Sequence, residues 1–284
     1  MALVPVTELL LDAEREGYAV GAFNANNMEI VQAIMNAAIK EQSPVIMQAS
    51  QGAIKYAGLE FITGMVRLAA QEADVPIALH LDHGTDFDQI VRCIRSGFTS
   101  VMYDGSRLPL EENIAITNKV LEITRPIGVS VEAELGKIGG TEDLIHVEAE
   151  DAIYTDPEEA RIFVEKTGVE SLAIAIGTAH GQYKGEPRLD FERLEKIKGL
   201  VNIPIVLHGS SGVPDDQIRR AIDLGVRKIN IDTNIREAFV WEARRQMQAN
   251  PDEIDPRKIL GPAREAATEI IREKMRLFGS AGKA

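Results

Sequence analysis

Three histidines of this chain share a pattern that suits metal chemistry. His83, His180 and His208 each stand at the end of a short apolar run, and each is followed directly by glycine. Only five histidines occur in the whole sequence. A lone histidine of this kind is usually a packed or surface residue, but three neutral imidazoles with an open fourth position form a catalytic zinc site. Nitrogen ligands without a thiolate also suit cobalt or iron, so the pattern favours a divalent metal centre.

The other two histidines have different surroundings. His80 lies two residues before Asp82, so both side chains point to the same side of a strand. We expect His80 to pack beside the site or to support its ligands. His146 lies in a polar loop, where we expect it to be exposed.

Three carboxylates follow or occupy the same kind of apolar run. Glu132 and Glu134 are two residues apart, so they face the same way along a strand. An inward carboxylate is costly to bury without a cation or donors. One of the two therefore pairs with a lysine such as Lys228, or they serve a metal as ligands or supports. Asp104 has the same two interpretations, and we expect Asp104 and Glu134 to offer an alternative metal position, with Glu132 the weaker candidate.

Two further segments suit an anion. Residues 208–212 read His-Gly-Ser-Ser-Gly, and residues 230–234 read Asn-Ile-Asp-Thr-Asn. The first can offer backbone N–H groups and hydroxyls, and the second can open a helix whose N-terminus attracts an anion. Residues 136–143 place glycines beside Thr141, Glu142 and Asp143, which predicts either a mobile lid that carries a base or a solvated loop.

These side chains need a fold that brings distant segments together. Short apolar runs alternate with amphipathic segments, which predicts an α/β protein with a parallel sheet. The expected strands are residues 18–23, 45–49, 77–81, 100–103, 129–135, 171–176, 205–207 and 228–231. The expected helices are residues 27–41, 59–73, 86–96, 110–124, 157–167, 191–199, 215–224 and 235 onward.

Eight such units in roughly 250 residues favour a (β/α)8 TIM barrel, in which the ends of all strands meet at one mouth. The alternative is an open doubly wound sheet, but no G-x-G-x-x-G motif follows the first strand. We expect residues 1–284 to form a single domain. The segment beyond Asn250 would add C-terminal helices against the barrel or a partner subunit.

Charge and cysteine content exclude several classes of protein. The 284 residues include 31 lysines and arginines and 44 acidic residues, a net charge of −13. A polynucleotide and an anionic membrane surface both bind through positive charge, so neither is expected as a partner. The single cysteine, Cys93, excludes an intrachain disulfide. With no signal peptide or apolar run of about 20 residues in view, we expect a cytoplasmic protein.

Five motifs follow one another along the chain. They read Leu-His-Leu-Asp-His-Gly (79–84), Val-Glu-Ala-Glu-Leu-Gly (131–136), Gly-Thr-Ala-His-Gly (177–181), Leu-His-Gly-Ser-Ser-Gly (207–212) and Lys-Ile-Asn-Ile-Asp-Thr (228–233). Together they resemble the class II, zinc-dependent aldolases of fructose bisphosphate and tagatose bisphosphate, and most of all the bacterial members. The likeness runs from residue 18 to residue 265. Tyr103 and Ser106 depart from it, since the family suggests an aliphatic residue and an alanine there.

The resemblance implies a role for each motif. His83, His180 and His208 would bind a catalytic Zn²⁺, with Co²⁺ as a substitute, and Asp104 and Glu134 a second divalent metal. Asp82 would be the proton donor to the aldehyde oxygen, and Glu142 would take part in proton abstraction. A monovalent cation, Na⁺ or K⁺, would lie near the phosphate. The residues that would bind the substrate are Asn24, Ser50, Gly181, Gly209, Ser210, Ser211, Asn230, Ile231, Asp232, Thr233 and Arg257.

The implied reaction is reversible aldol cleavage of fructose 1,6-bisphosphate to dihydroxyacetone phosphate and glyceraldehyde 3-phosphate, as in glycolysis and gluconeogenesis. The alternatives are a tagatose-1,6-bisphosphate aldolase of galactitol or tagatose catabolism and its non-catalytic sugar-phosphate-binding counterpart. Residues 258–265 are more similar to the glycolytic members. Arg257 would reach the second phosphate from a neighbouring subunit, which implies a homodimer or homotetramer.

Two other mechanisms fit the residues less well. A metal-dependent barrel hydrolase usually carries a His-x-His pair on its first strand, and residues 22–24 read Ala-Phe-Asn. A Schiff-base aldolase needs a desolvated lysine at the mouth of the barrel, and Lys228 lies at the opposite end of its strand. A Lewis-acid metal makes such a lysine unnecessary.

Overall fold

Eight parallel strands close into a barrel in the computed structural model, which describes residues 3–142, 145–147, 152–183, 185 and 187–284, with the backbone alone for residues 141, 142 and 145–147. The strand order around the barrel is β1, β11, β10, β8, β5, β4, β3, β2. This closure confirms the predicted TIM barrel and excludes the open sheet. The strands are β1 (Val20–Asn24), β2 (Val45–Ser50), β3 (Ile77–Gly84), β4 (Ser100–Tyr103), β5 (Ser130–Leu135), β8 (Ser171–Ile174), β10 (Ile205–Leu207) and β11 (Val226–Ile231).

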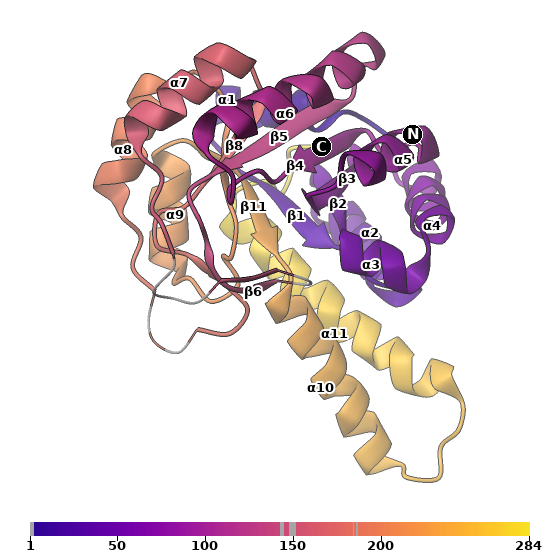
Figure 1. The fold of residues 1–284 in the computed structure, drawn as a ribbon. Helices are drawn as coiled ribbons and strands as arrows, with labels where there is room; N and C mark the ends of the chain where they lie inside the picture. The colour runs from indigo at the N-terminus through magenta and orange to yellow at the C-terminus, as the bar shows by residue number, and fades with distance from the viewer. Residues whose placement is uncertain (1–2, 143–144, 148–151, 184, 186) are drawn as a thin grey trace.

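Helices surround the barrel (Figure 1). They are α1 (Val6–Glu16), α2 (Met28–Glu41), α3 (Gln51–Ala57), α4 (Leu59–Glu72), α5 (Phe87–Ser96), α6 (Leu110–Thr124), α7 (Pro157–Thr167), α8 (Phe191–Leu200), α9 (Asp215–Asp223), α10 (Thr233–Ala249) and α11 (Pro256–Leu277). Helices α10 and α11 pack side by side and extend away from the barrel as a long hairpin, here called the helical arm (Figure 1). The expected C-terminal helices are therefore present.

Capping residues explain where several helices begin. Asn27 accepts a hydrogen bond from the backbone N–H of Ile30 at the start of α2. Asp86 and Asp156 cap α5 and α7 in the same way, and Pro157 occupies the first turn of α7. Such side chains satisfy backbone donors that have no partner within the helix.

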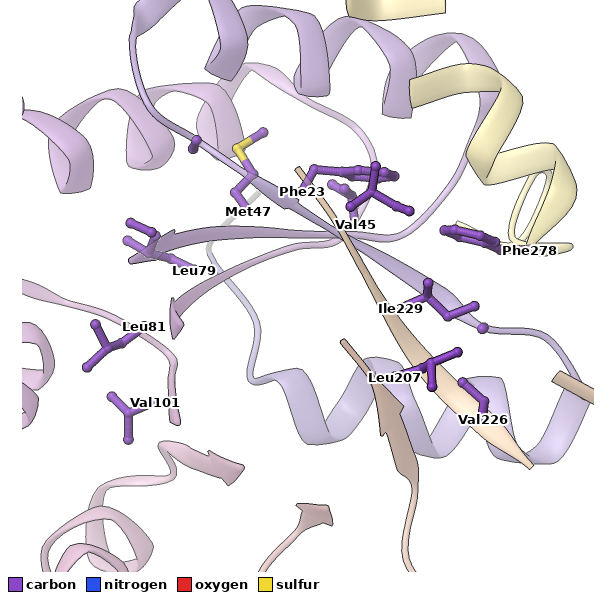
Figure 2. Packing of buried hydrophobic residues seen from close by; sticks show 14 of the residues in the cluster. Phe23, Val45, Met47, Leu79, Leu81, Val101, Leu207, Val226, Ile229 and Phe278 are labelled. Carbon is purple, nitrogen blue, oxygen red and sulfur yellow. The ribbon is translucent and has the colours of Figure 1, made fainter. Parts of the chain in front are cut away.

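Alternation along the strands separates the core from the site. Outward side chains such as Phe23, Met47, Leu79 and Ile229 are buried in the main hydrophobic cluster (Figure 2). Inward side chains change in character from one end of the barrel to the other. Val20, Ala22, Ile46 and Ala78 pack against α1, which closes the N-terminal end, whereas polar side chains occupy the interior above them. One period-two pattern therefore builds the core and directs polar groups to the mouth.

A small second sheet lies outside the barrel. Its strands are β7 (Ile145–Val147), β6 (Gly139–Glu142) and β9 (Ala179–His180), in that order. We expected a polar loop after the fifth barrel strand and did not predict these strands or α3. The described helices include none that is long and apolar enough to cross a membrane.

Candidate active site

Three histidine rings meet at the mouth of the barrel. His83 comes from the end of β3, His180 from β9, and His208 from the residue after β10. Their ring centroids lie 4.7 Å, 5.2 Å and 6.0 Å apart. All three side chains are buried, and one ring nitrogen from each lies within 4.8 Å of the others. The structure thus brings the predicted histidines together in an arrangement that can hold one metal ion.

The backbone at His83 explains how two consecutive residues reach the same site. Alternation along β3 points Asp82 inward and would point His83 outward. His83 has a φ of 48°, in the left-handed region, where histidine is more frequent than most residues. The register between β3 and β4 shifts at this place. This turn directs the imidazole of His83 back into the mouth, beside Asp82.

Charge in the histidine cluster is unevenly distributed. Burial opposes a charge on His83, but Asp82, Asp104 and Glu134 outweigh it and raise the pKa of His83 to about 10. Burial, together with the nearby His83, lowers the pKa of His180 and His208 well below the usual value, so these two rings are neutral. A neutral imidazole is the form that binds a metal, so His83 would give up its proton when an ion is bound.

Asp104 and Glu134 form a second set of candidate ligands with His83. One ligand atom from each of the three lies within 4.8 Å of the others. Asp104 Oδ2 lies 2.9 Å from His83 Nδ1, and Asp104 Oδ1 accepts hydrogen bonds from Ser106 at 2.6 Å and 3.1 Å. Although burial opposes it, these bonds hold the pKa of Asp104 well below its usual range. The unexpected Ser106 therefore contributes to the orientation of Asp104.

Glu134 is a buried carboxyl in need of a cation. Within the described residues, its Oε2 atom has no hydrogen-bond partner and lies 3.7 Å from His208 Nδ1 and 3.9 Å from His83 Nδ1. Burial, and then the charge of Asp104, raise the pKa of Glu134 well above the usual value. A divalent ion would remove this penalty, so the donor set fits a metal.

Asp82 receives three amide groups beside the histidines. Its Oδ1 accepts a hydrogen bond from Asn230 at 3.1 Å. Its Oδ2 accepts from Gln48 at 3.0 Å and from Asn24 at 3.4 Å, and Gln48 also donates to Asn24 Oδ1 at 2.7 Å. The carboxylate is fully buried, and this network fixes its direction.

Glu132 lies deeper in the barrel. Its Oε1 atom is 2.8 Å from His208 Nε2, and its Oε2 atom is 2.8 Å from Lys228 Nζ. The pairing with Lys228 is the structural alternative that we considered for these glutamates. His80 lies beside them, with its Nδ1 atom 2.8 Å from Ser100 Oγ, so it is the packed histidine that we expected.

A pocket opens next to the histidines. It is lined by His180, Gly181, Gly209, Ser211, Asn230, Asp232, Thr233 and Arg236. Six of these are predicted substrate-binding residues. The pocket includes Thr233, the first residue of α10. Backbone N–H groups at the N-terminus of a helix can bind an anion. Burial raises the pKa of Asp232 to about 6, which makes this carboxyl less strongly anionic than an exposed one.

The remaining predicted substrate residues lie elsewhere. Ser50 caps α3 by accepting a hydrogen bond from Ala53 N–H, and Ser210 is buried beneath the pocket. The side chain of Ile231 packs in the hydrophobic core, so only its backbone can serve a ligand. Arg257 lies at the start of α11 on the helical arm, pairs with Asp255, and has an 88% exposed side chain. It does not line the pocket of its own chain.

The lid prediction falls on a segment that the structure describes only in part. Gly139–Glu142 forms β6 and pairs with β9, so its first residues are strand. The side chains of Glu142 and His146, and all of Asp143, lie outside the described residues. The proposed base on this segment and the exposure of His146 stay predictions.

Three residues of the site were not predicted. Gln48 points inward from β2 because it alternates with Met47, and that alternation was a usable signal. Arg236 follows Thr233 by less than one helical turn. Tyr183 accepts a hydrogen bond from the Ala179 N–H at 2.8 Å and donates to the Gly209 carbonyl at 2.7 Å, a link between distant segments that no local pattern shows.

Comparison with known proteins finds one family over nearly the whole chain. The family model for class II fructose-bisphosphate aldolase matches residues 4–283. The chain is 48% identical over 305 residues to the fructose-bisphosphate aldolase of Thermus caldophilus, with 99% of this chain and 100% of that one covered. The fructose-bisphosphate aldolase of Geobacillus stearothermophilus is 49% identical over 287 residues, with 100% and 99% covered. The crystal structure of the YdjI aldolase from Escherichia coli K12 aligns with a TM-score of 0.87, 36% identity and 99% coverage of both chains.

Proposed function

The chain belongs to the class II fructose-bisphosphate aldolases, a family of metal-dependent lyases, and we propose that it cleaves fructose 1,6-bisphosphate reversibly at this site. The products are dihydroxyacetone phosphate and glyceraldehyde 3-phosphate. The observation that carries the proposal is the convergence of three histidines, Asp82 and an anion pocket at one barrel mouth.

The metal site is the histidine cluster. His83, His180 and His208 would hold Zn²⁺, or Co²⁺ in its place, since nitrogen ligands without a thiolate suit both ions. When bound, the ion acts as a Lewis acid that polarises the ketone and stabilises negative charge on the substrate. Asp104 and Glu134 share His83 with this set and would provide the second metal position.

Asp82 transfers the proton at the aldehyde oxygen. In the cleavage direction its carboxylate takes the proton from the substrate hydroxyl, and in the condensation direction it returns that proton. The amide groups of Asn24, Gln48 and Asn230 hold the carboxylate in position for both steps. Glu142 remains the proposed base for removal of the α-proton.

The pocket beside His180 binds one phosphate of the substrate. Backbone N–H groups of Gly181, Gly209 and the first turn of α10 would face the phosphate oxygens, with the hydroxyl of Ser211 and the charge of Arg236 beside them. Arg236 also pairs with Asp232 in this pocket, so much of the attraction would come from the N–H groups, which act locally despite the net charge of −13. A monovalent cation, Na⁺ or K⁺, would reinforce this attraction.

The second phosphate requires a residue from outside this pocket. Arg257 is exposed on the helical arm, and the arm also exposes Val240, Trp241, Met247 and Ile254. Apolar side chains gathered on a protruding element mark a protein contact. We therefore assign Arg257 to the site of a neighbouring copy in a homodimer or homotetramer. We also propose a cytoplasmic location, because sugar phosphates are metabolised there.

A coupled assay tests this function. Fructose 1,6-bisphosphate and tagatose 1,6-bisphosphate are supplied side by side to the purified enzyme, and the release of triose phosphate is followed. The proposal predicts faster turnover of the fructose compound. Preference for the tagatose compound would assign the chain to the tagatose branch, and no turnover of either would indicate a sugar-phosphate-binding protein.

A further inference from the structure

A cluster of charged and titratable side chains lies inside the barrel, below the histidine site. His80, Glu132, Lys228 and His208 are each at most 1% exposed. Barrel interiors are usually filled with branched apolar side chains, and a buried ion pair recovers its desolvation penalty only with favourable geometry. The distances between the atoms of this cluster therefore indicate which of its charged groups are paired.

Glu132 connects Lys228 to His208 of the proposed metal site. From β5, its two oxygens reach His208, which follows β10, and Lys228 on β11: Oε1 lies 2.8 Å from His208 Nε2, and Oε2 lies 2.8 Å from Lys228 Nζ. His80 Nε2 is farther away, 3.7 Å from Oε2, and the other nitrogen of that ring faces Ser100. The short contacts therefore join Lys228, Glu132 and His208 in one line.

The donor and acceptor roles along this line follow from the chemistry of each group. Lys228 has only donors, and an ionised carboxylate has only acceptors. The nitrogen of His208 that faces Glu132 must then carry the hydrogen. A neutral imidazole has one such hydrogen, so Nδ1 of His208 is left with its lone pair. That atom lies 3.0 Å from His83 Nε2 and faces the histidine cluster.

We propose that Glu132, with its charge balanced by Lys228, is a positioning residue that fixes the tautomer and ring direction of His208 and so presents Nδ1 to the metal site. The inference rests on the proposed metal role of His208. A carboxylate behind a ligand histidine also increases the electron density that the ring offers to a cation. Lys228 allows this carboxylate to be buried where no water reaches it.

Replacement of Glu132 by glutamine separates this role from simple packing. The amide has nearly the same shape, but it carries both a donor and an acceptor. His208 could then place its hydrogen on either nitrogen, and one of the two tautomers would block Nδ1. Since Glu132→Gln leaves the Lys228 charge unpaired, the charge-balanced double variant Glu132→Gln with Lys228→Met is measured beside it.

The test reads the tautomer and the metal separately. Long-range proton–nitrogen spectra of metal-free protein with isotope-labelled histidine show which ring nitrogen of His208 carries hydrogen, with the signals assigned by their loss in His208→Asn. We expect hydrogen on Nε2 in the wild type and a mixture of tautomers in both Glu132 variants. Competition with a zinc chelator should show about 10–100-fold weaker Zn²⁺ binding in those variants.

Glu170→Gln provides the matched control. Glu170 Oε2 accepts a hydrogen bond from the backbone N–H of Val131, next to Glu132 on the same strand, so the same chemical change is made without contact to His208. This variant should keep the wild-type tautomer and Zn²⁺ affinity.

Three results would contradict these assignments in distinguishable ways. Hydrogen on Nδ1 of His208 in the wild type overturns the inference directly, whether or not the variants fold. Wild-type Zn²⁺ affinity in both Glu132 variants overturns the inference alone and leaves the proposed function in place. Zn²⁺ binding and aldolase activity that survive His208→Asn overturn the metal assignment on which the inference rests.

Discussion

Asp82 shows how a single buried carboxylate can be held ready for proton transfer. Three amide groups from separate strands donate to its two oxygens, so the side chain cannot rotate away from the histidines. Amide donors are neutral, so they support the ionised carboxylate without placing a positive charge beside the proposed metal site. This environment suits a group that must first accept and later return a proton.

Replacement of Asp82 by asparagine tests this role. The amide keeps the shape of the side chain but cannot take up the proton, so we expect kcat to fall by about 10²–10⁴-fold. The Zn²⁺ content should stay at the wild-type level, because Asp82 is not one of the proposed metal ligands. Turnover and metal content are measured on the same preparation. Asp88→Asn, on the exposed face of α5, should change neither.

The residues of the site differ in how far sequence could predict them. Asp82 and His83 end β3, His208 follows β10, and His180 lies in β9, shortly after β8. Their place after an apolar run of their repeat is enough to predict that they meet. The partners of Glu132 depend on side-chain lengths across the barrel, and pairing with Lys228 could only be offered as one of two interpretations. The left-handed φ of His83 had no signal in the sequence beyond the glycine that follows it.

At the scale of elements, the proposed ligand His180 depends on segments outside the barrel. It lies in β9, which pairs with β6. Tyr183 joins the backbone at Ala179 to the carbonyl of Gly209, and Gly209 directly follows the proposed ligand His208. Two of the three histidines are therefore linked through one phenol, and the small sheet holds one of them.

Loss of the Tyr183 hydroxyl should loosen this link. In Tyr183→Phe the Ala179 N–H and the Gly209 carbonyl lose their partner, which costs about 1–3 kcal/mol for each group left buried and unsatisfied. We expect a lower free energy of unfolding in urea and faster release of Zn²⁺ to a chelator. If neither the free energy of unfolding nor the rate of Zn²⁺ release changes, the Tyr183 hydroxyl does not stabilise this link.

The same tyrosine predicts a dependence of stability on alkaline pH. Burial raises the pKa of Tyr183 to about 12, whereas a tyrosine in an unfolded chain has a pKa of about 10. The folded state thus holds the proton more tightly, so stability present below about pH 10 is lost as the pH rises through about 12. The loss should reach about 2–3 kcal/mol. Urea unfolding between pH 9 and pH 12 should show a shallower decline for Tyr183→Phe than for the wild type.

Close approach of two backbones makes a glycine necessary in β6. Gly140 has a φ of 100°, and a Cβ atom there would meet the backbone of His180. We expect Gly140→Ala to lower the free energy of unfolding by about 1–3 kcal/mol and to weaken Zn²⁺ binding. Gly64→Ala is the contrasting variant, because Gly64 lies within α4 with open space around it. It should raise stability by about 0.5–1 kcal/mol, as measured by the same unfolding curves.

Prediction of elements succeeded where a periodic pattern was long enough. All eight barrel strands and, apart from α3, the helices between them carry alternation or amphipathic spacing, and each of these was found within a few residues of its bounds. The strands of the small sheet have two to four residues and include two glycines. Such segments pair because the barrel holds their neighbours in place, and no local preference predicts them.

On the scale of the whole molecule, the net charge bears on the binding of an anionic substrate, and the helical arm bears on contact with a second copy of the chain. The chain carries a charge of −13, but the proposed phosphate pocket is local and would use backbone N–H groups and Arg236. The arm extends from the barrel with exposed apolar side chains (Figure 1). Its Arg257 is exposed and does not line the pocket of its own chain.

Complementation between two variants tests whether Arg257 acts across subunits. Asp82→Asn and Arg257→Ala are each expected to be weakly active alone. In a mixed dimer, the site of the Arg257→Ala chain has its own Asp82 and receives Arg257 from the other chain. Mixing and re-equilibration should therefore restore activity toward that of one wild-type site. If native mass spectrometry shows mixed dimers but activity does not recover, Arg257 has no such role.

The central claim is that three histidines hold one divalent ion that this reaction requires, and a metal titration tests it most directly. Wild-type enzyme is stripped with a chelator, Zn²⁺ is added back in steps, and fructose 1,6-bisphosphate cleavage is measured against bound metal per chain, beside His83→Ala, His180→Ala and His208→Ala. We expect no activity in the stripped enzyme, a rise that ends at about one Zn²⁺ per chain, and little recovery in the three variants. Full activity in thoroughly stripped enzyme, with a substrate imine trapped by borohydride, would contradict it.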